Sequence, residues 1–135
     1  MNQLFSHGEK RPSKAPPQRT LPIIERMVAV YKMWYGYRDH FPKKSRYTLG
    51  DKIDNVFIKI LECLCIASYQ KSEQKIGTIA VAINQLDILK FFIRLAWELA
   101  ILDNKKFIAL SEELHEIGKM LGDLKRGLES KTPAR

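Results

Sequence analysis

Apolar residues recur at spacings of three and four along most of this chain, which is the period of an α-helix that buries one face. The first such run lies between residues 20 and 39. Thr20 and Pro22 suit its start, because a proline in the first turn loses no hydrogen bond, and Pro42 stops the helix. The apolar positions of this predicted helix are Ile23, Ile24, Met27, Val28, Tyr31, Trp34 and Tyr35.

A second helix is predicted to begin inside the corner segment HFPKKSRYTLGDKI, residues 40–53, and to end near Tyr69. Thr48 and Asp51, three residues apart, match a capping box, in which the hydroxyl and the carboxylate each accept a hydrogen bond from an otherwise unpaired N–H group. Phe41 and Pro42 are expected to end the first helix and plug the bundle. The apolar stripe of the second helix is Ile53, Val56, Phe57, Ile60, Leu61 and Leu64.

A third helix is predicted over about residues 73–102, with Ser72 as a possible cap. Its second half is apolar nearly all round, except for one stripe of Lys90, Arg94 and Glu98. Such a helix must be covered on several sides, either by burial at the centre of the bundle or by another subunit, and we favour self-association. A membrane span is not expected, because the apolar stretch is short and charged. The candidate interface residues are Phe91, Phe92, Leu95 and Trp97.

Asp103 and Asn104 are predicted to break the chain before a fourth helix with a strict heptad seam. Four helices with short connections and no strand pattern predict an all-α fold, an antiparallel up-down four-helix bundle over residues 20–128. Residues 1–19 are predicted to be a disordered basic tail and residues 129–135 a flexible C-terminus. The seam consists of Phe107, Leu110, Leu114, Ile117, Leu121, Leu124 and Leu128.

The residue patterns of common active sites are missing. Glu112 and His115 form the Glu-x-x-His half of a carboxylate-bridged metal site. The heptad seam places both on the solvent side, however, and no second Glu-x-x-His follows. The histidines have no neighbouring nucleophile in a recognisable context, and the glycines are too scattered for a phosphate loop. We therefore predict a protein that is not an enzyme and has no metal or cofactor.

The formal net charge of +8 points to a polyanionic partner, RNA or DNA. Residues 1–60 carry 12 basic and 5 acidic side chains, whereas residues 61–135 carry 11 and 10. Tyr37, Phe41 and Tyr47 alternate with the basic residues, a mixture able to contact phosphates and stack on bases. The alternative is that these aromatics plug the bundle and the charges are merely solvated. The candidate nucleic-acid-binding residues are Arg38, Lys43, Lys44, Arg46, Lys52 and Lys59.

The cysteines and the N-terminal residues indicate in which compartment the protein is expected. Cys63 and Cys65 point to different faces of a helix and are expected to be buried, reduced thiols. The first residues lack the apolar stretch of a signal peptide. Both features predict a cytoplasmic protein.

Two groups of residues resemble the Avd-like family, the accessory variability determinants of diversity-generating retroelements. The first group is Leu21-Pro22-Ile23 together with the corner from Phe41-Pro42-Lys43 to Arg46-Tyr47-Thr48-Leu49-Gly50. The second is LKFFIRLAWEL, residues 89–99, with residues 110–122. Relatives of this family are the four-helix bundle proteins encoded by intervening sequences of bacterial ribosomal RNA genes.

The resemblance implies a homopentamer of four-helix bundles, barrel-like with a tapered channel and a positive surface. It also implies association with the retroelement reverse transcriptase and with template RNA in mutagenic retrohoming, in a bacterial or phage-infected cell. The alternative is a helical protein-binding scaffold of the ribosomal intervening-sequence branch, without a direct role at nucleic acid.

Overall fold

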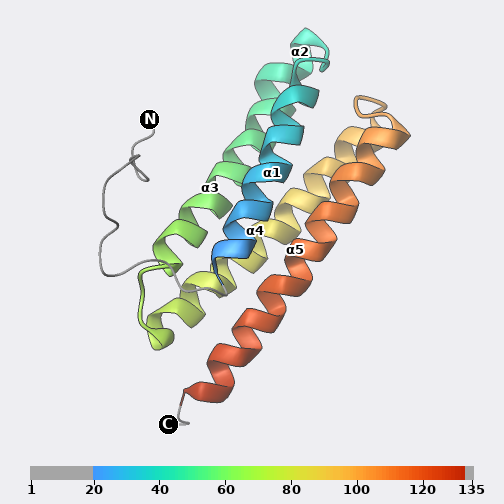
Figure 1. Cartoon of the computed structure of the whole chain (residues 1–135). Coiled ribbons are helices and arrows are strands. Elements are labelled where there is room, and N and C mark those ends of the chain that lie inside the picture. Colours follow the sequence, from blue (N-terminus) through green and yellow to red (C-terminus); the bar gives the residue numbers. More distant parts are fainter. Residues whose placement is uncertain (1–19, 133–135) are drawn as a thin grey trace, which may run out of the picture.

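The computed structural model describes residues 20–132, and every regular element in that range is helical. Four long helices run up, down, up and down, with α3 against α4, α4 against α5, and α1 closing the ring against α3 and α5 (Figure 1). The predicted all-helical bundle is thus confirmed for this part of the chain. The elements are α1 (Leu21–Arg38), α2 (Lys43–Ser45), the π-helical turn η2 (Arg46–Gly50), α3 (Asp51–Ala67), α4 (Ser72–Glu98) and α5 (Asn104–Lys131).

The core is built from the apolar stripes predicted for α1, α3 and α5 and from one side of α4. Tyr35, one of the apolar positions predicted for α1, is instead 63% exposed. Trp34 of α1 is its largest buried side chain; it stacks on Phe57 of α3 and meets Phe41 edge to face, with ring centroids 5.2 Å apart. The heptad seam of α5 is buried from Leu110 to Leu128, while Phe107 is half-buried. The predicted tail, residues 1–19, lies outside the described residues, as do residues 133–135.

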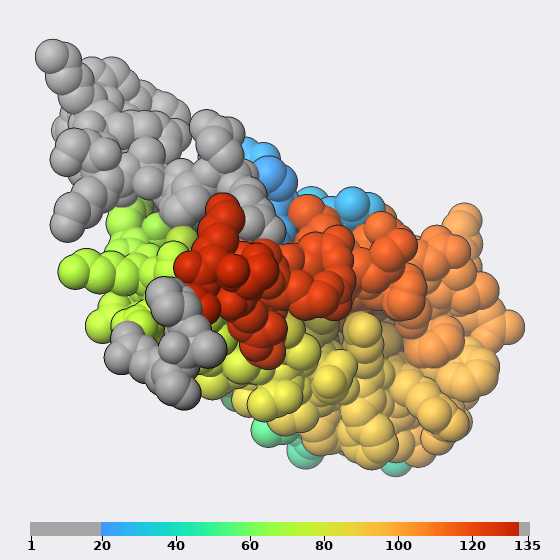
Figure 2. Space-filling view, turned by 90° about the horizontal axis from the view of Figure 1, so that it is seen from below, coloured from blue at the N-terminus to red at the C-terminus, as the bar shows by residue number. Residues whose placement is uncertain are grey.

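Helix α4 has two apolar sides, of which the bundle covers one. Its buried stripe includes Ile79, Leu86 and Ile93, seven residues apart, which face α3 and α5. Figure 2 shows α4 in yellow lying along α5 in orange and red. By length and composition alone, α4 is the one helix in residues 20–132 that could cross a membrane, a test that core helices of soluble proteins also pass.

The predicted capping box at Thr48 and Asp51 is wrong. Pro42 has an extended ψ of 146° and starts the helical chain already at Lys43, so Thr48 lies inside a turn. Its hydroxyl donates to the carbonyl oxygens of Lys44 and Ser45, at 3.2 and 3.4 Å, and caps no N–H group. The carboxylate of Asp51 instead accepts a hydrogen bond from Arg38.

Both ends of α4 also differ from the sequence prediction. Ser72 is the first helical residue rather than a cap, because Lys71 occupies the extended position before it. At the other end, the N–H of Ala100 donates to the Trp97 carbonyl, and that of Ile101 to the Ala96 carbonyl. This is a Schellman motif, and it ends the helix at Glu98, short of the predicted 102.

The Schellman motif holds Ala100 at φ 60°, a left-handed conformation that glycine adopts without steric cost. We expect Ala100→Gly to raise the free energy of unfolding by about 1 kcal/mol, because a left-handed residue with a Cβ costs about that much. Urea denaturation checks this. An unchanged or lower stability would contradict it. Ala109→Gly, in the second turn of α5, is the opposite control and should destabilise.

The two cysteines differ in their surroundings. Cys63 faces the core of the bundle, as predicted, and burial raises the pKa of its thiol. Cys65 is exposed, so its predicted burial is wrong. Two residues along a helix turn by roughly 200°, which carries the second side chain to the solvent side.

Candidate nucleic-acid interface

The positive charge of the bundle gathers at one end. The corner between α1 and α3, residues 37–52, has five basic and two acidic side chains, and the corner between α4 and α5, residues 94–106, has three and two. The other residues from 20 to 132 hold ten of each sign. The up-down order of the helices brings these corners to the same end of the bundle (Figure 1). We call these two corners together the basic end.

The two arginines of the first corner are engaged within the protein. Arg38 donates to Asp51 and lies 4.0 Å from a carboxylate oxygen of Asp54. Arg46 donates to the carbonyl oxygens of Asp39 and Phe41, at 3.3 and 3.2 Å, just beyond the C-terminus of α1. Their role as nucleic-acid contacts stays a prediction, while their geometry gives them a structural role.

The lysines of the basic end are freer. Lys43 and Lys44 of α2 and Lys105 of α5 are exposed, and within residues 20–132 none of them forms an ion pair. The ammonium of Lys106 lies 5.5 Å from the ring centre of Tyr37, a cation–π contact that links α5 to α1. Lys43, Lys44 and Lys105 can therefore bind phosphate groups without losing an internal partner.

Lys105 and Lys106 are absent from the sequence prediction. They belong to a corner some sixty positions away in sequence from Lys43 and Lys44. One signal was available: in an up-down bundle the first and third connections lie at the same end, so both corners could have been considered together.

Lys52, the last residue of the first corner, and Lys59 lie on the flank of α3 that borders α4. The Lys52 ammonium is 5.7 Å from the ring centre of Phe92 on α4. Lys59 is exposed two turns further along α3. Five of the six predicted binding residues thus belong to the first corner: two engaged arginines, the two exposed lysines of α2, and Lys52. Lys52 faces the flank of α3, where Lys59 also lies.

The aromatic residues of the first corner have separate environments. Phe41 is 2% exposed and plugs the bundle against Trp34, as predicted. Tyr37 is half-buried beneath Lys106. Tyr47, in η2, is 63% exposed. The proposed alternation of charges and aromatics thus leaves one ring open to a ligand.

A partly buried polar cluster between α1 and α3 fixes this corner. One carboxylate oxygen of Asp54 accepts hydrogen bonds from the Tyr31 hydroxyl at 2.9 Å and the Trp34 indole at 3.2 Å. Burial, and then the hydrogen bond to Asp54, raises the pKa of Tyr31 to about 12. Arg38, held by Asp54 and Asp51, completes the cluster and joins it to the corner.

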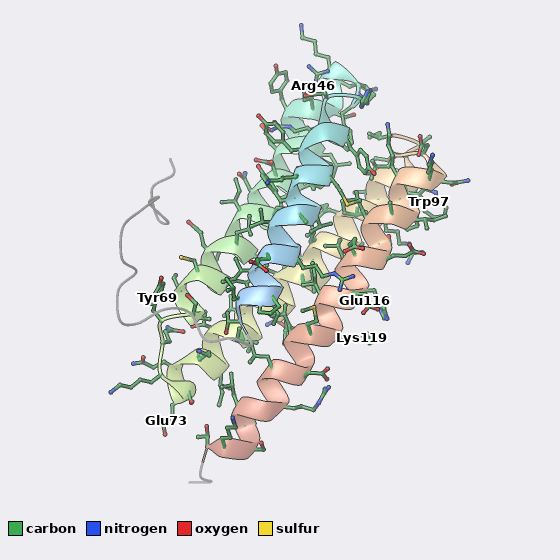
Figure 3. All side chains as sticks on the ribbon, viewed as in Figure 1. Arg46, Tyr69, Glu73, Trp97, Glu116 and Lys119 are labelled. Carbon is green, nitrogen blue, oxygen red and sulfur yellow. The ribbon has the colours of Figure 1, made fainter. Side chains whose placement is uncertain are left out.

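The predicted oligomer interface is divided between two sides of α4. Phe91 is 61% exposed and packs edge to face on Phe92, and Leu95 is half-buried one turn later. Val81 and Ile88 extend this exposed apolar strip along the helix. Trp97 lies apart from it: its ring stacks on Phe107 of α5 and its indole donates to Asn104 (Figure 3).

Residues considered for a metal site lie on the outside of α5. Glu112 and His115 are exposed, as the heptad seam predicted. Glu113 pairs with Arg26 of α1 at 3.0 Å, a contact that raises the pKa of Arg26. Among the described residues, no group of three His, Cys, Asp or Glu side chains could hold a metal ion.

The sequence of this bundle matches the model of a known protein family. The bAvd-like family model matches residues 21–128, from the first residue of α1 into the last turns of α5. The chain belongs to the bAvd-like family. The match covers both corners of the basic end as well as the exposed strip of α4. No curated protein matches the chain.

Proposed function

We propose that this bAvd-like protein is a non-catalytic, nucleic-acid-binding accessory protein of a diversity-generating retroelement. In this role it associates with the reverse transcriptase and template RNA during mutagenic retrohoming. The observation that carries the proposal is the concentration of unpaired lysines at the basic end, in a bundle whose other described charges balance. Family membership supports the accessory role.

Binding in this proposal is mainly electrostatic. Lys43, Lys44 and Lys105 are exposed on two adjacent corners, and each can replace a counterion at a phosphate. Point charges on flexible stems position a nucleic acid without reading its sequence. The proposed ligand is therefore RNA or DNA bound with little sequence preference.

Self-association is part of the same proposal. Val81, Ile88 and Phe91 form an exposed apolar strip on α4, and Phe92 and Leu95 border it. An exposed apolar strip of this kind is typical of a surface that binds protein. We propose that a second copy covers it, in the homopentamer that the family resemblance implies.

The experiment is charge reversal at the basic end. The triple variant Lys43→Glu, Lys44→Glu and Lys105→Glu should bind RNA and DNA at least about tenfold more weakly near 0.1 M salt, because each lost phosphate contact removes the release of a counterion that favours binding. The slope of log K against log salt should become shallower by about 2 on single strands and by about 2.7 on duplex. Fluorescence anisotropy over a series of salt concentrations measures both.

A matched control makes the same change in net charge away from the basic end. Lys119→Glu, Arg126→Glu and Lys131→Glu alter three exposed residues of α5 and should leave binding within about twofold, since distant surface charges are screened. Sedimentation should give the same particle size for all three proteins. The proposal fails if the parent protein shows no salt-sensitive binding, or if the corner variant binds as the parent does.

The exposed strip of α4 favours a second candidate function, a helical scaffold that binds protein only. It predicts that a complex with a reverse transcriptase survives nuclease treatment, and that the chain alone has no affinity for nucleic acid.

A further inference from the structure

Tyr47 is the one aromatic residue of the α1–α3 corner whose ring is largely open to solvent, since Phe41 is buried and Tyr37 is half-buried. Within residues 20–132, no aromatic ring or lysine stacks on it. It lies four residues after Lys43, so the two side chains share a helical face. An unpartnered ring thus stands beside the unpaired lysines of the basic end.

We propose that Tyr47 is a stacking platform for an unpaired base, and that the basic end prefers single-stranded nucleic acid to duplex. This inference rests on the proposed nucleic-acid binding. The lysines contact phosphates of either form, because both carry the same charged backbone. The ring adds affinity only where a base face is free, since in a duplex the neighbouring base pairs cover it.

The position of Tyr47 also favours a base over a peptide side chain. The α2 and η2 segment forms the tip of the bundle (Figure 1), and Figure 3 places the neighbouring Arg46 there. A protruding ring offers a flat face, whereas an apolar peptide side chain is bound best in a concave, apolar pocket. Stacking tolerates any base, which agrees with a site that does not read sequence.

The test compares Tyr47→Leu with the parent chain on a single-stranded oligonucleotide and on a duplex of equal length. We expect the variant to bind the single strand about tenfold more weakly, the loss typical of one stacked base. Duplex binding should change less than twofold. Tyr47→Phe keeps the flat ring and should bind the single strand as the parent does.

Tyr69→Leu is the matched control. Tyr69 is 51% exposed and has a neighbouring lysine, Lys71, two residues on, but it lies at the opposite end of the bundle from Arg46 (Figure 3). Its replacement should leave both affinities unchanged. An equal loss for Tyr69→Leu would overturn the assignment of stacking to the basic end.

The other outcomes separate this inference from the proposed function. If the parent binds neither oligonucleotide, the proposed function fails, and the inference falls with it. A second outcome is that the parent binds in a salt-sensitive way while Tyr47→Leu weakens binding of the single strand and of the duplex equally, or weakens neither. In either case the proposed function stands and only the stacking role of Tyr47 is wrong. Poly-glutamate is a competitor that resembles an acidic protein. If it displaces the single strand from the parent protein but not from Tyr47→Leu, the ring binds an acidic protein partner and the inference is overturned.

Discussion

Replacing Phe41 by alanine is expected to lower the free energy of unfolding by about 3–5 kcal/mol, the usual cost of truncating a buried phenylalanine. Phe41 is fully enclosed where the chain turns from α1 into α2, and its ring packs on Trp34. Its loss would leave a cavity at the end of the core. Such a cost is a large share of a typical domain stability of about 5–15 kcal/mol.

Thermal and urea denaturation at one fixed protein concentration measure this effect, because self-association would make the stability depend on concentration. The midpoint temperature should fall by about 10–20 °C. Tyr47→Ala, in the same corner but exposed, is the control and should stay within about 0.5 kcal/mol of the parent. A loss below about 1 kcal/mol for Phe41→Ala would mean that Phe41 does not close the bundle.

Asp54→Ala is expected to destabilise the protein by about 2–4 kcal/mol. Asp54 accepts hydrogen bonds from Tyr31 and Trp34, so its removal leaves two donors in the α1–α3 interface without their acceptor. It also removes a negative charge beside Arg38. Asp54→Asn keeps an acceptor oxygen and should cost less than alanine.

The pH dependence provides a second measurement on the same cluster. The pKa of Tyr31 is raised to about 12 in the folded protein, from an ordinary value of 10.0. The unfolded chain therefore loses this proton first, so the contribution of Tyr31 is fully present below pH 10 and disappears as the pH rises toward 12. Tyr31→Phe should reduce this alkaline loss of stability.

In Asp54→Ala, the pKa of Tyr31 should fall part of the way back, because the hydrogen bond and the charge are lost while burial remains. Tyrosinate absorbance, with Tyr31→Phe subtracted, follows this titration. A double-mutant cycle between Tyr31 and Asp54 then isolates their coupling. An unchanged pKa of Tyr31 together with a coupling near zero would contradict the proposed cluster.

The helices themselves could be read from local pattern. The seam of α5 repeats every three and four residues, and any helix with that spacing presents one apolar side that must be buried. Pro22 and Pro42 marked the start and the end of the first helix, because a proline constrains its own φ and lacks an N–H group. The buried position of Phe41 followed from its place between two such stripes.

The helix ends were harder to predict. Thr48 has the residue type of a cap, but the chain had already become helical at Lys43, so its hydroxyl bonds to a carbonyl instead. Ala100 lacks the usual sequence signal of a left-handed helix end, which is glycine. Competing hydrogen bonds within a few residues decide such boundaries, and residue type alone does not rank them.

Some features of the candidate site could likewise be predicted from the sequence, whereas others required the fold. By itself, the sequence determined the apolar stripes of α1, α3 and α5, the excess of positive charge and the corner in which Lys43, Lys44 and Tyr47 lie, because all of these are properties of neighbouring residues. The tertiary structure decided that Arg38 and Arg46 are engaged, that Tyr47 rather than Phe41 or Tyr37 is open, and that Lys105 lies at the same end. These outcomes depend on how the chain turns at the corner, where Arg46 folds back on the end of α1 and Arg38 meets Asp51. The position of Lys105 depends on the packing of whole helices, which brings the two corners to one end.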